Sequence, residues 1–276
     1  MGMNMIIYQI VNEYKKLDEV VAITLAGSGA SGRKDNFSDI DIDIITNGEI
    51  SLDKRKEIIS KISDNMEIGN NFWGAGDEFV LRNSDVIVDL AYFDLNWLKD
   101  GLINVVDNYN ASTGYTTCFW HNVIHSSIIY DKNREFEELQ KKYNIPYPVE
   151  LKKSIIEKNY PILRNVFSAY YNQIYKAIKR KDIVSINHRI AAYLASYFDI
   201  IFAINEIPHP GEKRLIAICN KICNKKPENF EKNLNDILRY SLDQGEIVLD
   251  IINDMVDQLD LVLKSEGLFI GINKEC

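Results

Sequence analysis

A turn rich in glycine and serine, followed by two alternating aspartates, is the part of the sequence best suited to chemistry. Residues 26–32 read Ala-Gly-Ser-Gly-Ala-Ser-Gly and follow an apolar stretch. Glycine lets the backbone approach a ligand closely, so the N–H groups of such a turn can cradle a phosphate. Asp39 and Asp41 lie two residues apart, which places both carboxylates on one face of a predicted strand. A phosphate cradle beside ligands for a hard cation predicts metal-assisted phosphoryl chemistry on a nucleotide.

A third carboxylate lies further along the chain. Residues 85–93 form a β-branched and aromatic run that predicts a strand, with Asp89 in its middle. An aspartate inside an apolar strand is costly unless it has a charged partner such as a metal ion. We therefore take Asp39, Asp41 and Asp89 together as the candidate catalytic and metal-binding residues. Asp43 continues the alternation, and we interpret it as a strand residue that faces a polar neighbour.

This arrangement resembles the signature of the polymerase-beta-type nucleotidyltransferase superfamily. That signature is a Gly-Ser pair, a spacer, and Asp-apolar-Asp within an apolar strand, followed by a third acid on a later strand. Here Gly27-Ser28 and then Ser38-Asp39-Ile40-Asp41 stand in that order, and Asp89 matches the third acid. The serine before the first aspartate favours this pair, although Asp41 with Asp43 also fits the loosest form of the pattern.

The resemblance implies how the site would work. Gly27-Ser28 and Ser38 would bind the nucleotide. ATP is the expected co-substrate only because members of the family usually use it, since no residue of the motif recognises a base. The three aspartates would hold Mg²⁺, with two ions expected. Asp89 would either complete the metal site or accept the proton of the acceptor. Many small members have an arginine where this chain has Ser31, and Arg33 is a candidate substitute for it.

Composition limits the class of protein. The chain has 276 residues, 46% of them hydrophobic and 26% charged, which is typical of a globular protein with two domains. The net charge of −8 argues against a template-directed polymerase or an RNA-tailing enzyme, and we expect no nucleic-acid partner. We also expect no membrane segment and no signal peptide. The four cysteines lack the spacing of a disulfide framework, so a cytoplasmic protein is expected.

The pattern of apolar residues divides the chain near the Ile-Pro-Tyr-Pro sequence at 145–148, which resists regular structure. Before it, helical and strand patterns mix, and the resemblance implies an α+β catalytic domain with a mixed sheet over residues 1–145. After it, residues 146–276 are predicted to form an all-α helical bundle that binds the substrate. The predicted strands are 20–25, 40–45, 79–81, 86–93 and 128–130. The predicted helices are 3–18, 51–62, 97–106, 149–180, 183–205, 212–223, 228–240 and 243–265.

Three features outside the motif, one of them a pair of histidines, invite a functional interpretation. Lys213 opens a predicted helix, where a cation is unfavourable to the helix dipole. The resemblance implies that it reaches the triphosphate, while an exposed loop charge is equally consistent. Asp199 is a lone acid in the most apolar helix, and its partner would be a substrate amine, Arg164 or Lys213. His121 and His125 have a spacing that can bind zinc, but no third ligand is evident, so ordinary packing is favoured.

These observations predict an Mg²⁺-dependent enzyme that transfers a nucleoside monophosphate, AMP from ATP, to a hydroxyl of a small molecule and releases pyrophosphate. The two-domain organisation resembles the aminoglycoside and lincosamide nucleotidyltransferases, which implies an antibiotic-resistance enzyme with a cationic acceptor. One alternative is nucleotidylation of a protein or an RNA, as in the toxin–antitoxin branch of the superfamily. Others are a non-catalytic nucleotide-binding protein and a template-directed polymerase.

Overall fold

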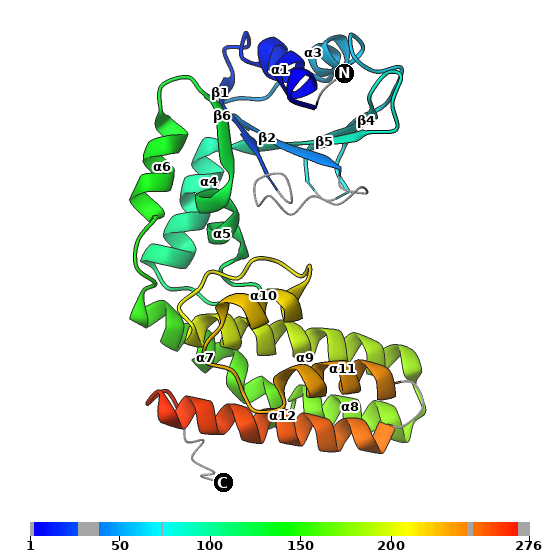
Figure 1. The fold of residues 1–276 in the computed structure, drawn as a ribbon, viewed down its shortest axis with the longest axis vertical. Helices are drawn as coiled ribbons and strands as arrows, with labels where there is room; N and C mark the ends of the chain where they lie inside the picture. The colour runs from blue at the N-terminus through cyan, green and yellow to red at the C-terminus, as the bar shows by residue number, and fades with distance from the viewer. Residues whose placement is uncertain (1–2, 27–38, 73, 242–244, 270–276) are drawn as a thin grey trace. The chain divides into compact units, whose positions relative to one another are not determined.

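The computed structural model describes residues 3–26, 39–72, 74–241 and 245–269 (Figure 1). A six-stranded mixed sheet with the order β3-β4-β5-β2-β1-β6 forms the centre of the N-terminal part. Strands β2 and β5 are parallel, and the other neighbours in the sheet are antiparallel. The strands are β1 (Val20–Leu25), β2 (Ile40–Thr46), β3 (Asn65–Asn70), β4 (Gly76–Val80), β5 (Ile87–Asp94) and β6 (Ser127–Asp131). The predicted mixed sheet is confirmed.

Alternation in β2 explains how this strand presents its acids. Ile40, Ile42 and Ile44 are at most 2% exposed and join the apolar core on one face. Asp41 and Asp43 alternate with them and therefore lie on the opposite face. A shift of one residue would bury the acids and expose the isoleucines, so the hydrophobic pattern fixes which face the acids occupy.

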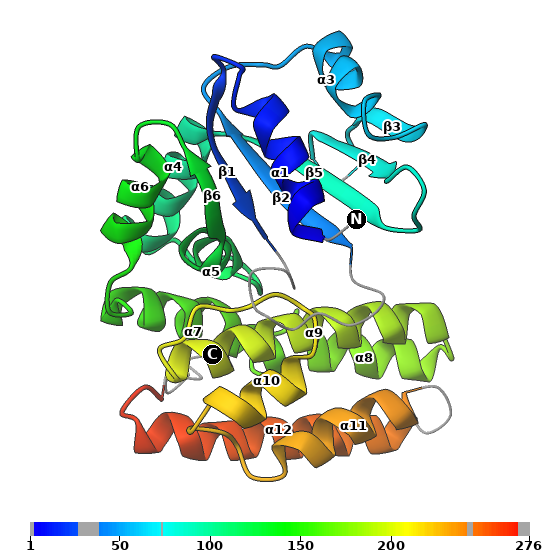
Figure 2. The same ribbon diagram turned by 45° about the horizontal axis from the view of Figure 1, so that its top comes forward.

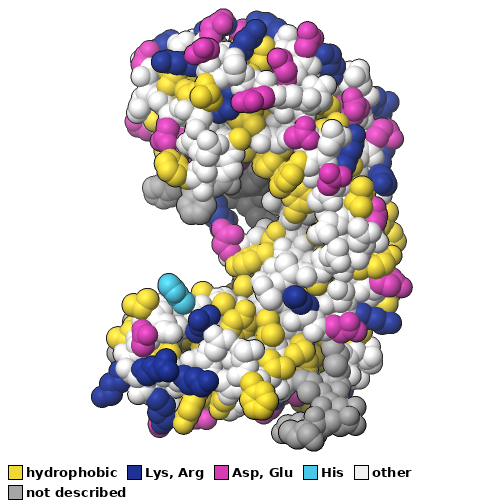
Figure 3. Space-filling model, turned by 180° about the vertical axis from the view of Figure 1, so that it is seen from behind, with side chains coloured by type: hydrophobic (Ala, Val, Ile, Leu, Met, Phe, Trp, Pro, Cys, Tyr) yellow, Lys and Arg dark blue, Asp and Glu magenta, His cyan; other side chains and the backbone are white. Residues whose placement is uncertain are grey.

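Two helices cover the apolar face of the sheet, α1 (Met3–Tyr14) and α3 (Leu52–Ile59), as Figure 2 shows. Ile10 and Tyr14 of α1 and Ile59 of α3 are buried in the same core as the isoleucines of β2. Helix α3 begins after Ser51, whose side chain accepts a hydrogen bond from the backbone N–H of Lys54, as expected for an N-cap. On the face drawn in Figure 3, side chains of both charges are interspersed over this part of the protein.

The chain folds into two compact units. One contains Met1–Ile103 and Asn122–Ile145, and the other contains Asn104–His121 and Pro146–Cys276. Nothing in the sequence signalled that residues 104–121 would join the helical unit. The predicted roles of domains 1–145 and 146–276 stay predictions. Residues 95–143 contain helix α4 (Leu95–Leu102), the π-helical turn Ile103–Asp107, helix α5 (Cys118–His125) and helix α6 (Glu135–Tyr143).

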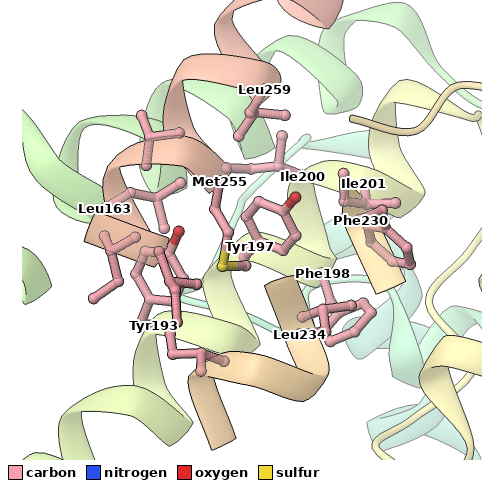
Figure 4. Close-up of a cluster of buried hydrophobic side chains, with 14 of the residues drawn as sticks. Leu163, Tyr193, Tyr197, Phe198, Ile200, Ile201, Phe230, Leu234, Met255 and Leu259 are labelled. Atoms are coloured by element: carbon pink, nitrogen blue, oxygen red, sulfur yellow. The ribbon is translucent and has the colours of Figure 1, made fainter. Parts of the chain in front are cut away.

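The second unit is helical, as predicted. Its helices are α7 (Val149–Arg164), α8 (Tyr170–Lys179), α9 (Ile183–Ile204), α10 (Leu215–Ile222), α11 (Phe230–Tyr240) and α12 (Gly245–Ser265). Helix α9 is apolar nearly all round and packs against α7 and α8. Figure 4 shows Tyr197, Phe198 and Ile201 of this helix in the core of the unit, with Phe230 of α11 and Met255 of α12. None of the helices in the described residues combines the length and apolar character needed to cross a membrane.

Some predicted elements differ from the structure. The predicted helix 149–180 is two helices, because the chain leaves helical geometry after Asn165 and reaches extended geometry at Ala169. The intervening Val-Phe-Ser sequence consists of poorer helix formers. Strand β3 was not predicted, since its Asn-Met-Glu-Ile-Gly-Asn sequence has little strand character. Pairing with β4 stabilises it, and so tertiary context overrides local propensity.

Candidate functional site

Two of the three predicted catalytic acids lie side by side. Asp41 of β2 and Asp89 of β5 are register partners in the parallel pair formed by these strands. Residues paired in this way point their side chains to the same face of a sheet, so both carboxylates lie opposite the apolar core. Asp39 directly precedes β2 and is exposed. Burial raises the pKa of Asp89, and the negative charge of Asp39 raises it further, so these two carboxyl groups interact electrostatically.

Asp43 is a fourth acid on the same face. It is partly buried, and burial raises its pKa to about 7, while the nearby charges of Asp41 and Asp89 act in the same direction. The Thr24 hydroxyl of β1 donates a hydrogen bond to Asp43 Oδ2 over 3.4 Å, which partly offsets the rise in pKa. Thr24 is thus the polar neighbour expected for this side chain.

The pKa of Asp89 is raised chiefly by burial and then by the charge of Asp39. Carboxylates that raise one another's pKa gain from a bound proton or cation. Carboxylate oxygens are also the ligands that Mg²⁺ prefers, so the donor chemistry of Asp39, Asp41 and Asp89 fits this ion. Within the described residues, however, no three His, Cys, Asp or Glu side chains are already arranged to hold a metal ion. The expected convergence of the three acids therefore stays a prediction.

Two glutamates that were not predicted from the sequence extend the acidic face. Glu78 of β4 is the register partner of Asp89, and Glu67 of β3 is the register partner of Glu78. With Asp41, they form a row of carboxylates across four neighbouring strands. Both glutamates are exposed. The signal in the sequence was weak, because only the pairing of β3 and β4 brings these acids beside Asp89.

The residues expected to bind the phosphates can be placed only in part. Gly27, Ser28, Ser38 and Arg33 lie outside the described residues. Lys213 is exposed in the turn before α10, in the helical unit.

The predicted start of the helix after Lys213 was wrong. Helix α10 begins at Leu215, after Arg214 adopts a left-handed conformation with φ of 58°. Lys213 therefore does not lie in the first helical turn, and the helix dipole gives no reason for its position. Its phosphate-binding role stays a prediction.

Asp199 has partners within the helical unit. Its carboxylate accepts hydrogen bonds from the backbone N–H of Thr116 over 3.1 Å and from its hydroxyl over 2.6 Å. Asn159 Nδ2 is a weaker third donor at 3.4 Å. The suggested partner Arg164 instead pairs with Asp257 at 2.6 Å. Burial raises the pKa of Asp199 to about 7, although the bonds from Thr116 oppose that rise.

The histidine pair expected at 121 and 125 lies on α5. In the described part of the chain, no metal-binding group of three side chains includes either histidine. A different histidine, His209, is fully buried and contacts Cys118 Sγ through Nδ1 at 3.3 Å. Burial lowers the pKa of His209 to about 4 and raises that of Cys118 to about 12. This pair is therefore neutral near pH 7 and unsuited to a thiolate nucleophile.

Comparison with known proteins gives one family match. Residues 8–72 match the family model described as polymerase beta, nucleotidyltransferase. No curated protein sequence matches the chain significantly.

Several solved structures are similar at low identity. A nucleotidyltransferase-like protein from Exiguobacterium sibiricum is 14% identical, with a TM-score of 0.44, over 97% of this chain and 76% of that one. Spectinomycin adenyltransferase AAD(9) from Enterococcus faecialis, solved with ATP and spectinomycin, is 13% identical, with a TM-score of 0.28, over 91% of this chain and 98% of that one. The Thermotoga maritima CCA-adding enzyme complexed with tRNA is 9% identical, with a TM-score of 0.29, over 97% of this chain and 83% of that one.

The family match spans the Gly-Ser turn, Asp39 and Asp41. The third acid of the signature, Asp89, lies on the strand paired with β2 and directly beside Asp41. Residues 8–72, with the Gly-Ser turn and the aspartates that follow it, therefore match the polymerase beta nucleotidyltransferase family.

Proposed function

We propose that the protein is an Mg²⁺-dependent enzyme that transfers AMP from ATP to a hydroxyl of a small molecule and releases pyrophosphate. The observation that carries this proposal is the in-register pairing of Asp41 and Asp89 on the polar face of the sheet. A degenerate, non-catalytic protein would have no reason to keep these acids paired on an exposed face. The family match over residues 8–72 supports the reaction class.

The roles of the acids follow from their positions. Asp39, Asp41 and Asp89 would hold Mg²⁺, and Gly27, Ser28 and Ser38 would bind the triphosphate. When bound, the ion would neutralise charge that develops on the phosphate oxygens. Asp89 is exposed, so an acceptor hydroxyl can reach its carboxylate. In the alternative in which Asp89 does not bind the ion, its carboxylate would take the proton of that hydroxyl.

The acidic row favours a cationic acceptor. Asp41, Asp89, Glu78 and Glu67 line neighbouring strands, and the whole chain carries a net charge of −8. Such a surface attracts positively charged molecules. An aminoglycoside-type antibiotic combines several amines with hydroxyl groups, so we propose this class as acceptor and antibiotic resistance as the biological role. We propose a cytoplasmic location, where ATP is available.

A screen of acceptors tests this function. The protein is incubated with Mg²⁺ and each of ATP, GTP, CTP and UTP, together with pooled aminoglycosides and lincosamides, and products are identified by mass. We expect an acceptor that gains one AMP, with one pyrophosphate released per product. Labelling of a protein or an RNA from cell extract, without any modified small molecule, would instead support the macromolecular alternative. Binding of Mg²⁺ and ATP without any product would indicate a non-catalytic protein.

A further inference from the structure

A buried polar network lies on the other face of the sheet, behind the acids. The hydroxyl of Tyr92, on β5, donates a hydrogen bond to Asp77 Oδ2 of β4 over 2.6 Å. The Tyr92 hydroxyl proton is therefore used in the bond to Asp77. The hydroxyl of Tyr14, 2.6 Å away, must then donate its own proton to the Tyr92 oxygen. Asp77 also pairs with Arg55 of α3, whose Nε donates over 2.9 Å, and accepts the backbone N–H of Gly69 over 2.7 Å. The network thus joins β5 to α1, α3 and β4.

The partners of Tyr92 in this network are deeply buried, and Tyr92 itself is half-buried. Arg55 is 6% exposed and Asp77 is 0% exposed, and the guanidinium of Arg55 lies 4.1 Å from the centre of the Tyr92 ring. Removing two charges from water is costly, and apolar residues of similar size often serve stability equally well. Stability alone therefore gives a weak reason for such a network, whereas specification of one arrangement of strands gives a better one.

The apolar pattern of β5 leaves its position along the sheet open. Val88, Leu90 and Tyr92 face the core, and Asp89 faces the acidic side. A shift of two residues would keep every side chain on its present face, because side chains alternate with a period of two. It would move β5 by about 6.6 Å and place Asp89 opposite Asp39 or Asp43 instead of Asp41.

The hydroxyl of Tyr92 removes that freedom. Hydrogen bonds of 2.6 Å to partners on both sides would break on a two-residue shift of about 6.6 Å. Tyr14 and Asp77 are fully buried, so water would not replace the lost bonds. The penalty for the shifted register is therefore larger at Tyr92 than at the apolar positions of the same strand.

We propose that Tyr92, held between Tyr14 and Asp77, is a positioning residue that fixes β5 along the sheet and thereby keeps Asp89 beside Asp41. The structural part of this proposal, that Tyr92 fixes the position of β5, depends only on the hydrogen bonds of this network. Its catalytic part rests on the proposed nucleotidyl transfer, because only that reaction requires the two carboxylates to meet.

The variant Tyr92→Phe tests the proposal, because it removes the hydroxyl and keeps the ring. Amide hydrogen exchange of β5 and β2 is measured without metal, and kcat and KM for ATP are measured with saturating Mg²⁺. We expect exchange at least ten-fold faster than in the wild type, kcat at least ten-fold lower, and KM for ATP within two-fold. The matched control is Ile59→Val, a buried change in α3 that removes no hydrogen bond. Each protein is measured at the same number of degrees below its own melting temperature. Under these conditions the control should show the exchange rate and the kcat of the wild type.

The variant Tyr14→Phe and the double variant give a second, independent reading. Because Tyr14 acts through Tyr92, its substitution should change exchange much less in the Tyr92→Phe background than in the wild type. Additive effects, or a Tyr92→Phe protein that matches the control in exchange, would overturn the proposal. Faster exchange with unchanged kcat would overturn the link to Asp89. If the wild type transfers no nucleotide, the proposed function fails, and the exchange data alone decide whether Tyr92 fixes the register.

Discussion

At the scale of single residues, electrostatics separates the acids of this chain into two groups. Asp39, Asp41 and Asp89 lie on a polar face, where a cation can reach them. Asp199 is 1% exposed, and donors from Thr116 and Asn159 surround it. The first group suits a site that binds a ligand, whereas the bonds to Asp199 serve to hold residues 104–121 against the helices.

The pH dependence of stability should report on Asp199. Its folded-state pKa of about 7 lies above the unfolded value of about 3.9, so the folded state holds an extra proton between these limits. The contribution of Asp199 to stability is therefore present below about pH 4 and is lost as the pH rises to about 7. In Asp199→Asn this loss is absent, because the amide stays neutral and can donate to the Thr116 hydroxyl.

Urea unfolding of both proteins between pH 4 and pH 8 makes the comparison. His209, with its pKa lowered to about 4, acts in the opposite direction in both proteins, so the difference between the two isolates Asp199. The wild type should lose about 2–4 kcal/mol relative to the variant over this range. Parallel stability curves would contradict the assignment.

At the scale of elements, the buried pair Arg55–Asp77 predicts a large effect of breaking it. Asp77→Ala leaves the guanidinium of Arg55 buried without its carboxylate, which should lower the free energy of unfolding by about 3–5 kcal/mol. The matched control is the Arg82–Asp64 pair, which has the same chemistry in an exposed position. Asp64→Asn should change stability little, because solvent already screens that pair. Equal losses in chemical denaturation would refute the role of burial.

Strand β2 could be predicted from the sequence because its isoleucines and aspartates alternate without interruption. The same alternation fixed the face of Asp41. Asp89 could be selected as a lone acid within an apolar strand, and it also matched the third acid of the family signature. Strand β3 and the acid row through Glu78 could not be foreseen, since they depend on pairing between strands of weak propensity. The partner of Asp199 was also beyond prediction, because Thr116 lies 83 residues away in sequence.

At the scale of the whole molecule, the main feature is that residues 104–121 belong to the helical unit. Gly114 lies against α9 with φ of 81°, where a Cβ atom would come within 2.8 Å of the Ala195 side chain. Its backbone N–H donates to Asn159, which is fully buried, over 3.0 Å. The helical unit is therefore completed by a segment that precedes it by more than twenty residues in sequence.

An isolated fragment 146–276 should consequently fold poorly. Without residues 104–121, Asp199 and Asn159 lose donors or acceptors in the core, which is costly for buried polar groups. Circular dichroism should show lower helicity and a broader thermal transition than the same helices have in the full chain. Asp199→Leu in the fragment should recover part of the helicity, because no carboxylate is then buried without donors. A fragment that melts as cooperatively as the full chain would disprove this dependence.

The most direct measurement of the central claim is transfer of labelled AMP by the wild type and by Asp41→Asn. This substitution keeps the size of the side chain and removes the charge that Asp41 supplies beside Asp89. We expect Mg²⁺-dependent transfer by the wild type that chelation abolishes, and at least a hundred-fold loss of kcat in the variant. Glu49→Gln, an exposed acid just beyond β2, serves as the control and should keep wild-type activity. Undiminished transfer by Asp41→Asn would show that Asp41 has no part in the reaction.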